Sequence, residues 1–155
     1  MTGITLLLIA LVAALAFGLV WQRRQGKVRT TGDATAAVTG ERRRLLEAAG
    51  VGPGHPRQAT VLHFSADWCG PCAAVRRVVG QVVADLAGEP EPPLEVEVDI
   101  DEYPALAKEL GVLSLPTTFI LDADLQQRFR VSGVPTAGDL RAALGPLTRP
   151  PASNS

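Results

Sequence analysis

The pattern of apolar and polar positions after residue 40 predicts alternating helices and strands. Residues 59–66 form a short apolar run rich in β-branched and aromatic side chains, which is typical of a buried strand. Residues 94–100 alternate strictly between apolar and acidic side chains, which predicts a strand with one exposed face. Two more strands are expected at 117–121 and 127–131, joined as a hairpin by Asp122-Ala123-Asp124. Apolar positions recur at helical spacing in 41–49, 71–87, 103–110 and 136–144.

The order of these elements predicts the fold class. A βαβ unit followed by a ββα unit gives an α/β domain, with a mixed sheet and helices on both faces. We expect this domain to span residues 41–147. Residues 22–40 are predicted to be a linker, with a short strand near 27–31 but no clear first strand. The polar, proline-containing residues 148–155 are predicted to be a disordered tail.

A different pattern precedes the domain, because residues 4–21 carry no charged side chain. A helix of this length would be about 27 Å long, close to the roughly 30 Å hydrocarbon core of a bilayer. Trp21 ends the segment with an amphipathic ring suited to the headgroup level. Residues 1–3 lack the basic side chains of a signal peptide, and a buried helix of a soluble protein would carry one polar face. We therefore predict a transmembrane anchor over residues 1–21.

Charge is divided unevenly along the 155-residue chain, although its net value is only −1. Residues 22–44 carry seven basic and two acidic side chains, whereas residues 45–155 carry eight basic and fourteen acidic ones. By the positive-inside rule, the basic flank places the domain on the cytoplasmic side of the membrane. An extracytoplasmic domain is the alternative. The acidic part has no basic stripe with interleaved aromatic residues, so we expect no nucleic-acid binding.

The candidate chemistry lies in Trp68-Cys69-Gly70-Pro71-Cys72, which contains the two cysteines of the chain. Cys69 falls where the first strand gives way to a helix, and the unpaired N–H groups there stabilise a thiolate. Pro71 suits the first helical turn, and Cys72 lies inside that turn. We therefore expect Cys69 to attack a substrate disulfide and Cys72 to resolve the mixed disulfide.

Three other interpretations of the two cysteines are open. A zinc site would need about four ligands, and only His55 and His63 could join the two thiols. A purely structural disulfide would close too small a loop to stabilise the fold much. Two incidental thiols would leave the Gly-Pro between them unexplained.

The segment 64–72, Phe-Ser-Ala-Asp-Trp-Cys-Gly-Pro-Cys, closely resembles the active-site segment of the thioredoxin family. Residues 98–104 resemble the family's third strand and the start of its next helix, and residues 111–119 resemble its cis-proline loop. The resemblance covers roughly residues 40–147 and implies a thioredoxin fold. It implies that Pro116 is cis and that the backbone beside it, at Leu115, pairs with an extended substrate. The residues that it assigns to the substrate surface are Trp68, Gly70, Pro71, Leu115, Pro116, Gly133 and Val134.

One pair of residues departs from the family pattern. The family commonly has a buried aspartate six residues before the first cysteine, with a lysine on the neighbouring strand. The aligned motifs place His63 at the aspartate position and Glu97 at the lysine position. His63 would then be the proton acceptor for Cys72, with Glu97 as its partner, since an unperturbed histidine titrates near pH ~6.5. The alternative is that Glu95, Glu97 and Asp99 form a solvated face and His63 is a packed core residue.

The predicted function is a membrane-tethered protein disulfide reductase whose redox group is the Cys69–Cys72 pair, with no separate cofactor and no metal. The expected partners are protein disulfides, a membrane through residues 4–21 and, for a cytoplasmic domain, a thioredoxin reductase. One alternative is an extracytoplasmic reductase of exported or cytochrome-maturation thiols. The other is a tethered binding module without enzyme activity.

Overall fold

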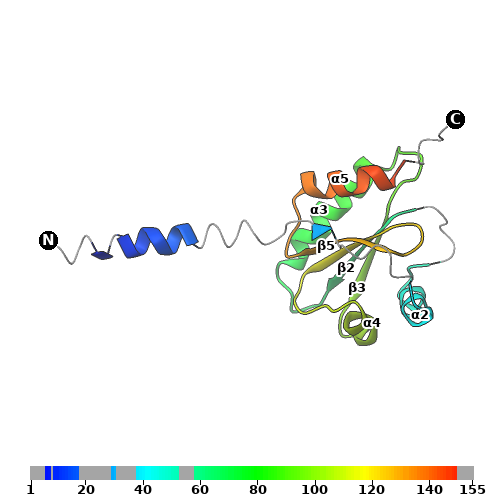
Figure 1. The fold of residues 1–155 in the computed structure, drawn as a ribbon, viewed down its shortest axis with the longest axis horizontal. Coiled ribbons are helices and arrows are strands. Elements are labelled where there is room, and N and C mark those ends of the chain that lie inside the picture. The colour runs from blue at the N-terminus through cyan, green and yellow to red at the C-terminus, as the bar shows by residue number, and fades with distance from the viewer. Residues whose placement is uncertain (1–5, 8, 18–28, 31–37, 53–57, 150–155) are drawn as a thin grey trace.

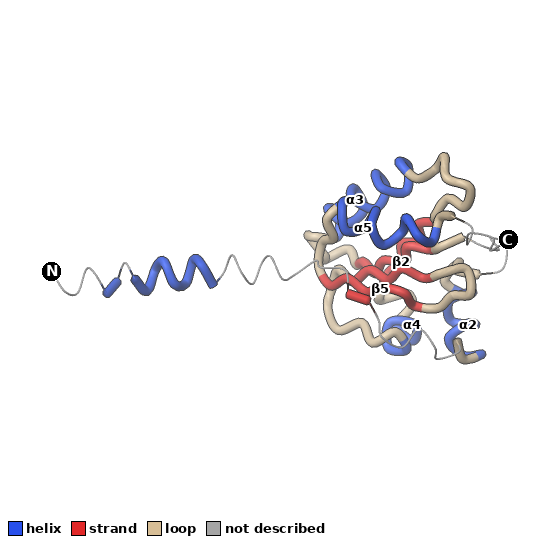
Figure 2. The backbone as a smooth tube through the Cα atoms, turned by 45° about the horizontal axis from the view of Figure 1, so that its top comes forward, coloured by secondary structure: helices blue, strands red, loops and turns tan. Residues whose placement is uncertain are grey.

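The computed structural model describes residues 6–7, 9–17, 29–30, 38–52 and 58–149. Its centre is a five-stranded mixed sheet with the strand order β1-β5-β4-β2-β3. Helices α3 and α5 cover one face of the sheet, and α2 and α4 cover the other (Figures 1 and 2). The predicted α/β class, with a mixed sheet and helices on both faces, is therefore confirmed.

The helices and strands lie close to the ranges expected from the sequence. The strands are β1 Arg29–Thr30, β2 Thr60–Ser65, β3 Leu94–Asp99, β4 Thr117–Leu121 and β5 Gln127–Ser132. The helices are α2 Gly40–Ala48, α3 Cys72–Asp85, α4 Pro104–Glu109 and α5 Ala137–Leu144, followed by the 3-10 turn η1 Gly145–Leu147. Strand β1 lies inside residues 22–40, which the sequence assigned to a linker, and it confirms the short strand expected near 27–31.

Strand β2 is the central element that positions the site. It pairs in parallel with β3 and antiparallel with β4. All six of its residues are buried, because β2 has a neighbouring strand on each side and helices above and below. Strand β3 lies at the edge of the sheet and keeps the alternating exposure predicted from its acidic positions.

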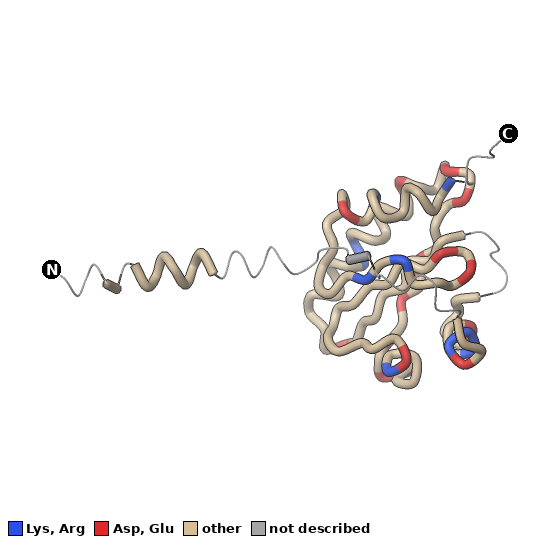
Figure 3. Tube along the Cα trace, viewed as in Figure 1, with Lys and Arg blue, Asp and Glu red and all other residues tan. Residues whose placement is uncertain are grey.

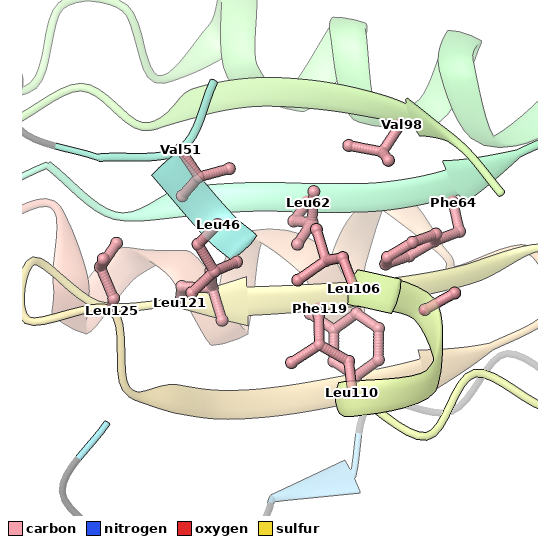
Figure 4. Close-up of a cluster of buried hydrophobic side chains, with 11 residues drawn as sticks. Leu46, Val51, Leu62, Phe64, Val98, Leu106, Leu110, Phe119, Leu121 and Leu125 are labelled. Carbon is pink, nitrogen blue, oxygen red and sulfur yellow. The ribbon is translucent and has the colours of Figure 1, made fainter. Parts of the chain in front are cut away.

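Two apolar cores hold the helices on the sheet. The core under α2 and α4 contains Phe64 and Phe119, whose rings meet edge to face at 6.0 Å between centroids (Figure 4). Such an aromatic pair contributes about 0.5–1.5 kcal/mol beyond its buried area. The core under α3 and α5 joins Val61 and Ile120 of the sheet to helix residues of both elements. The helix residues buried there are Val75, Val79, Val82, Leu140, Ala143 and Leu144.

Local signals set the helix ends. The Thr39 hydroxyl accepts a hydrogen bond from the backbone N–H of Arg42 at 3.2 Å, and that of Thr136 accepts one from Asp139 at 3.1 Å. Both are N-caps of the kind that satisfy an otherwise unpaired helix donor. Gly111 follows α4 with a φ of 63°, a left-handed conformation that favours glycine.

The N-terminal apolar segment is described in part. Residues 6–7 and 9–17 are helical, and none of them is charged (Figure 3). Their large apolar side chains are between 57% and 73% exposed. No helix among the described residues is both long enough and apolar enough to cross a membrane. The predicted segment 4–21 extends beyond the described residues at both ends, so the anchor stays a prediction. The predicted tail 148–155 begins too early, because Thr148 is buried and its N–H donates to the carbonyl of Leu144 at 3.1 Å; residues 150–155 lie outside the described residues.

Candidate functional site

The two cysteines form a disulfide at the start of α3. The S–S distance is 2.01 Å, and the two Cα atoms are 5.5 Å apart. The loop after β2 turns so that the N–H of Cys69 donates to the carbonyl of Ala66 at 3.0 Å, and that of Cys72 donates to the carbonyl of Cys69 at 3.2 Å. Pro71 is the N-cap of α3 and offers no side-chain hydrogen bond. Cys69 is partly exposed and Cys72 only 1% exposed, which matches the predicted attacking and resolving roles.

Trp68 is fixed beside the disulfide although its side chain is 70% exposed. Its indole N–H donates to a carboxylate oxygen of Asp101 at 3.2 Å. Asp101 follows β3, so this hydrogen bond joins the loop after β2 to the loop after its neighbouring strand. Asp101 was not among the predicted site residues, although it lies within residues 98–104, which resemble the family.

Pro116 lies where the sequence analysis expected it. The Leu115–Pro116 peptide bond is cis. Thr117 pairs with Phe64 in the β2–β4 register, which places Pro116 beside the end of β2, where the cysteine loop begins. The N–H of Gly133 donates to the carbonyl of Pro116 at 2.8 Å, so the turn after β5 also joins this end of the sheet.

His63 lies in the middle of β2, with 1% of its surface exposed. Side chains alternate along a strand, so His63 shares a face with Val61, which packs under α3. Thr118 is its partner on β4, and the Thr118 hydroxyl is buried without a hydrogen-bond partner among the described residues. Cys72, the first residue of α3, holds its Sγ 3.9 Å from the carbonyl oxygen of Phe64, the residue after His63. His63 therefore lies beneath the helix that carries the resolving cysteine.

The predicted pairing of His63 with Glu97 needs a correction. Glu97 is the register partner of His63 on β3, as the aligned motifs implied. The imidazole Nε2, however, lies 3.0 Å from Oε1 of Glu95, two residues earlier on the same strand. Glu97 is instead bound by Arg76 of α3, whose Nε lies 2.7 and 2.8 Å from the two carboxylate oxygens. Arg76, which was not among the predicted site residues, thus binds the carboxylate that was expected to pair with His63.

The environment of Glu97 favours its charged form. Burial raises the pKa of this carboxyl, but hydrogen bonds from Ser65 and Arg76 and electrostatic attraction to His63 and Arg76 outweigh that effect. The net effect is a pKa below the ordinary value of 4.5 for a glutamate side chain. Glu97 therefore acts as a fixed negative charge between β3 and α3.

The described residues contain no group of three or more His, Cys, Asp or Glu side chains placed to hold a metal ion. His55, the other histidine considered for a zinc site, lies outside the described residues. Gly70 is exposed and a Cβ built on it would meet nothing within 4 Å, so the surface next to the disulfide is open. Leu113, in the loop before Pro116, is 92% exposed and was not singled out from the sequence.

Comparison with known proteins gives the same assignment for most of the domain. Residues 54–145 match the sequence model of the Thioredoxin family. The chain is 35% identical over 78 residues to the chloroplastic M-type thioredoxin of Chlamydomonas reinhardtii, covering 50% of this chain and 53% of that protein. It is 36% identical over 87 residues to the thioredoxin-like protein slr0233 of Synechocystis, covering 56% of this chain and 78% of that protein.

A solved structure also shares the fold. It is that of thioredoxin-2, described as a component of malaria parasite protein secretion machinery. The match has a TM-score of 0.52 at 25% sequence identity and covers 57% of this chain and 82% of that one.

Proposed function

Because this chain belongs to the thioredoxin family, we propose that it is a thiol–disulfide oxidoreductase that reduces protein disulfides while tethered to a membrane. The single observation that carries the chemistry is the Cys69–Cys72 disulfide at the start of α3, with one sulfur partly exposed and the other buried. The redox group is part of the chain itself. The proposed tether is supported by the apolar segment 4–21, and the proposed class of substrate by the surface around the disulfide.

The reaction balances with these two sulfurs. In the reduced protein, the Cys69 thiolate attacks a substrate disulfide, and the first substrate sulfur leaves as a thiolate. Cys72 then loses its proton and attacks Cys69, the bond from Cys69 to the second substrate sulfur breaks, and the Cys69–Cys72 disulfide forms. The substrate disulfide gains two electrons, and the protein dithiol loses two. A thioredoxin reductase is the proposed donor that restores the dithiol.

The surface around the disulfide suits an extended polypeptide. The substrate surface proposed here consists of Trp68, Gly70, Pro71, Leu115 and Pro116. The indole of Trp68 is exposed and held in place by Asp101. An absence of side chain at Gly70 lets a substrate backbone approach the sulfurs. These features favour a protein disulfide over a small disulfide as the substrate.

Two serine variants test the chemistry by the reduction of insulin disulfides with dithiothreitol as the electron source. Wild-type protein should accelerate the reaction, and Cys69→Ser should not exceed the rate without protein. Cys72→Ser should instead accumulate a mixed disulfide through Cys69, detectable by mass spectrometry. A Cys69→Ser variant that keeps full activity would refute the proposal and favour a binding module.

The tether is supported by the apolar segment 4–21 and by the exposure of its described helical residues, which bury no apolar surface in the domain core. The basic flank at residues 22–44 favours the cytoplasmic side. Removing residues 1–21 should move the protein from the membrane fraction to the soluble fraction. A reporter enzyme that works only in the cytoplasm should show activity when it is fused to the C-terminus. An inactive reporter with an intact fusion would place the domain on the other side of the membrane.

A further inference from the structure

The hydrogen bond between His63 and Glu95 joins a buried base to a carboxylate that solvent reaches. The side chain of His63 is 1% exposed and that of Glu95 is 29% exposed. Gly80 of α3 passes over this carboxylate, and a Cβ built there would lie 3.7 Å from Oε2 of Glu95. The glycine therefore presents no side chain that would cover the carboxylate.

The chemistry of the two partners fixes the roles of the ring nitrogens. An ionised carboxylate can only accept a hydrogen bond, so Nε2 of His63 is the donor to Glu95. In a neutral imidazole the other nitrogen, Nδ1, then carries the lone pair. Nδ1 is therefore the atom that takes up a proton, and Nε2–H is the end of the ring that faces the exposed carboxylate.

Glu97 is poorly placed for the same task. Both of its oxygens are held by Nε of Arg76, at 2.7 and 2.8 Å. A carboxylate whose charge is matched by an adjacent guanidinium is a weaker attractor for a second positive charge. Arg76 thus leaves Glu95 as the carboxylate that bonds to the imidazole.

From these contacts we propose that Glu95 is a positioning residue that orients His63 and carries the Cys72 proton to solvent. The inference rests on the proposed function, since it concerns the resolving step of that reaction. The Cys72 thiol gives its proton to Nδ1 of His63, and the imidazolium is stabilised through Nε2–H by Glu95. The Cys72 thiolate then attacks Cys69 and expels the substrate thiolate with its electron pair. The imidazolium gives its Nε2 proton to Glu95, which releases it to solvent and leaves the ring protonated at Nδ1. When the Cys69–Cys72 disulfide is reduced again, the Nδ1 proton returns to the Cys72 thiolate, and Glu95 passes a solvent proton back to Nε2.

Charged and titratable groups reach this region from two elements. Strand β3 contributes Glu95 and Glu97, and α3 contributes Arg76 and Cys72. From β4 the facing residue is Thr118, which is uncharged. Glu95→Gln should therefore remove the charge in direct contact with His63, whereas Glu97→Gln removes an equal charge from the same strand without breaking that contact.

The resolving step can be isolated by rapid mixing of reduced protein with an aromatic disulfide whose released thiolate is coloured. The first phase reports attack by Cys69, and the second, unimolecular phase reports attack by Cys72. Near neutral pH we expect Glu95→Gln to slow the second phase about tenfold, a part of the 10²–10⁴ range of general acid–base catalysis, and to leave the first phase within about twofold. The pH of half-maximal second-phase rate should fall, because a general base acts in its neutral form and an imidazole without the adjacent negative charge loses its proton at lower pH. Glu97→Gln should change this pH less.

The outcomes separate the inference from the proposed function. A wild-type protein without a first phase would refute the oxidoreductase function itself. If the first phase is normal, two results would refute the role of Glu95 and leave the proposed function intact. One is an equal slowing of the second phase by Glu95→Gln and Glu97→Gln, and the other is no effect of Glu95→Gln. A measurement without variants avoids the risk of misfolding: in the reduced wild-type protein, ring ¹⁵N chemical shifts of His63 should show the tautomer protonated at Nε2. A neutral ring protonated at Nδ1 in the reduced protein would overturn the proposal.

Discussion

Arg130 of β5 ties together three parts of the domain, and its replacement by methionine gives a measurable test of the fold around the site. Its guanidinium donates to the carbonyl of Gly111 at 2.8 Å and to that of Leu110 at 3.4 Å, where α4 ends. The same group lies 5.2 Å from the ring centroid of Phe119 in the core. The segment fixed in this way runs directly into the loop that carries Pro116.

The expected cost of Arg130→Met follows from these contacts. The shorter hydrogen bond contributes about 1 kcal/mol net, and the longer one little. A cation over an aromatic ring adds about 0.5–1 kcal/mol, and a positive charge at a helix C-terminus about 0.3–1 kcal/mol. Methionine keeps most of the apolar stem, so the total loss is about 2 kcal/mol. At roughly 4–8 °C per kcal/mol for a domain of this class, the melting temperature should fall by about 10 °C.

Arg128→Met is the matched control, because Arg128 lies two residues earlier on the same strand. Among the described residues it forms an ion pair with Asp122 at 3.5 Å, which is solvent-exposed on the arginine side. Such pairs contribute about 0–1 kcal/mol. Urea and thermal unfolding of the oxidised protein should show a clearly larger loss for Arg130→Met than for Arg128→Met. Equal losses, or a loss below about 0.5 kcal/mol for Arg130→Met, would refute the reasoning, since surface substitutions alone reach that size.

Two further substitutions probe polar groups beneath α3. Thr118→Val removes a buried hydroxyl that has no partner among the described residues and should raise the free energy of unfolding by about 1 kcal/mol. A lower urea midpoint in this variant would show that the hydroxyl is bonded. Glu97→Gln should cost about 0.2–1 kcal/mol near neutral pH, where the Arg76 pair is intact. Because the pKa of Glu97 is lowered in the folded state, its contribution to the free energy of unfolding is fully present above the ordinary value of 4.5 and is lost as pH falls through the lower folded-state pKa. The wild-type and variant unfolding curves should therefore converge in acid, and a difference that persists there would contradict this linkage.

The sequence predicted the elements of the domain better than the contacts between them. The acidic alternation in 94–100 and the apolar run in 59–66 predicted β3 and β2, because burial of a strand follows directly from its side-chain pattern. Strand β1 was only suggested, since two residues are too few to carry a pattern and their pairing depends on β5.

The partner of His63 shows a different limit. Alignment of motifs gave the register of β2 and β3 correctly, and it paired His63 with Glu97. The hydrogen bond goes to Glu95 because Arg76, a residue of the helix above the sheet, binds Glu97. A contact between a helix and a strand is set by tertiary packing, which the pattern along either segment does not contain.

The acidic side chains of β3 also bear on the solubility of the protein. An edge strand offers unpaired N–H and C=O groups to any other strand, and charged side chains along it discourage such pairing between molecules. Glu95, Glu97 and Asp99 place three carboxylates on this edge strand. Glu95 and Glu97, which bind His63 and Arg76 within the fold, thus also protect the sheet from aggregation. The charges on β3 therefore serve both the redox site and the solubility of the protein. A chain with an uncharged β3 would be more prone to aggregate even if it had lost its redox chemistry.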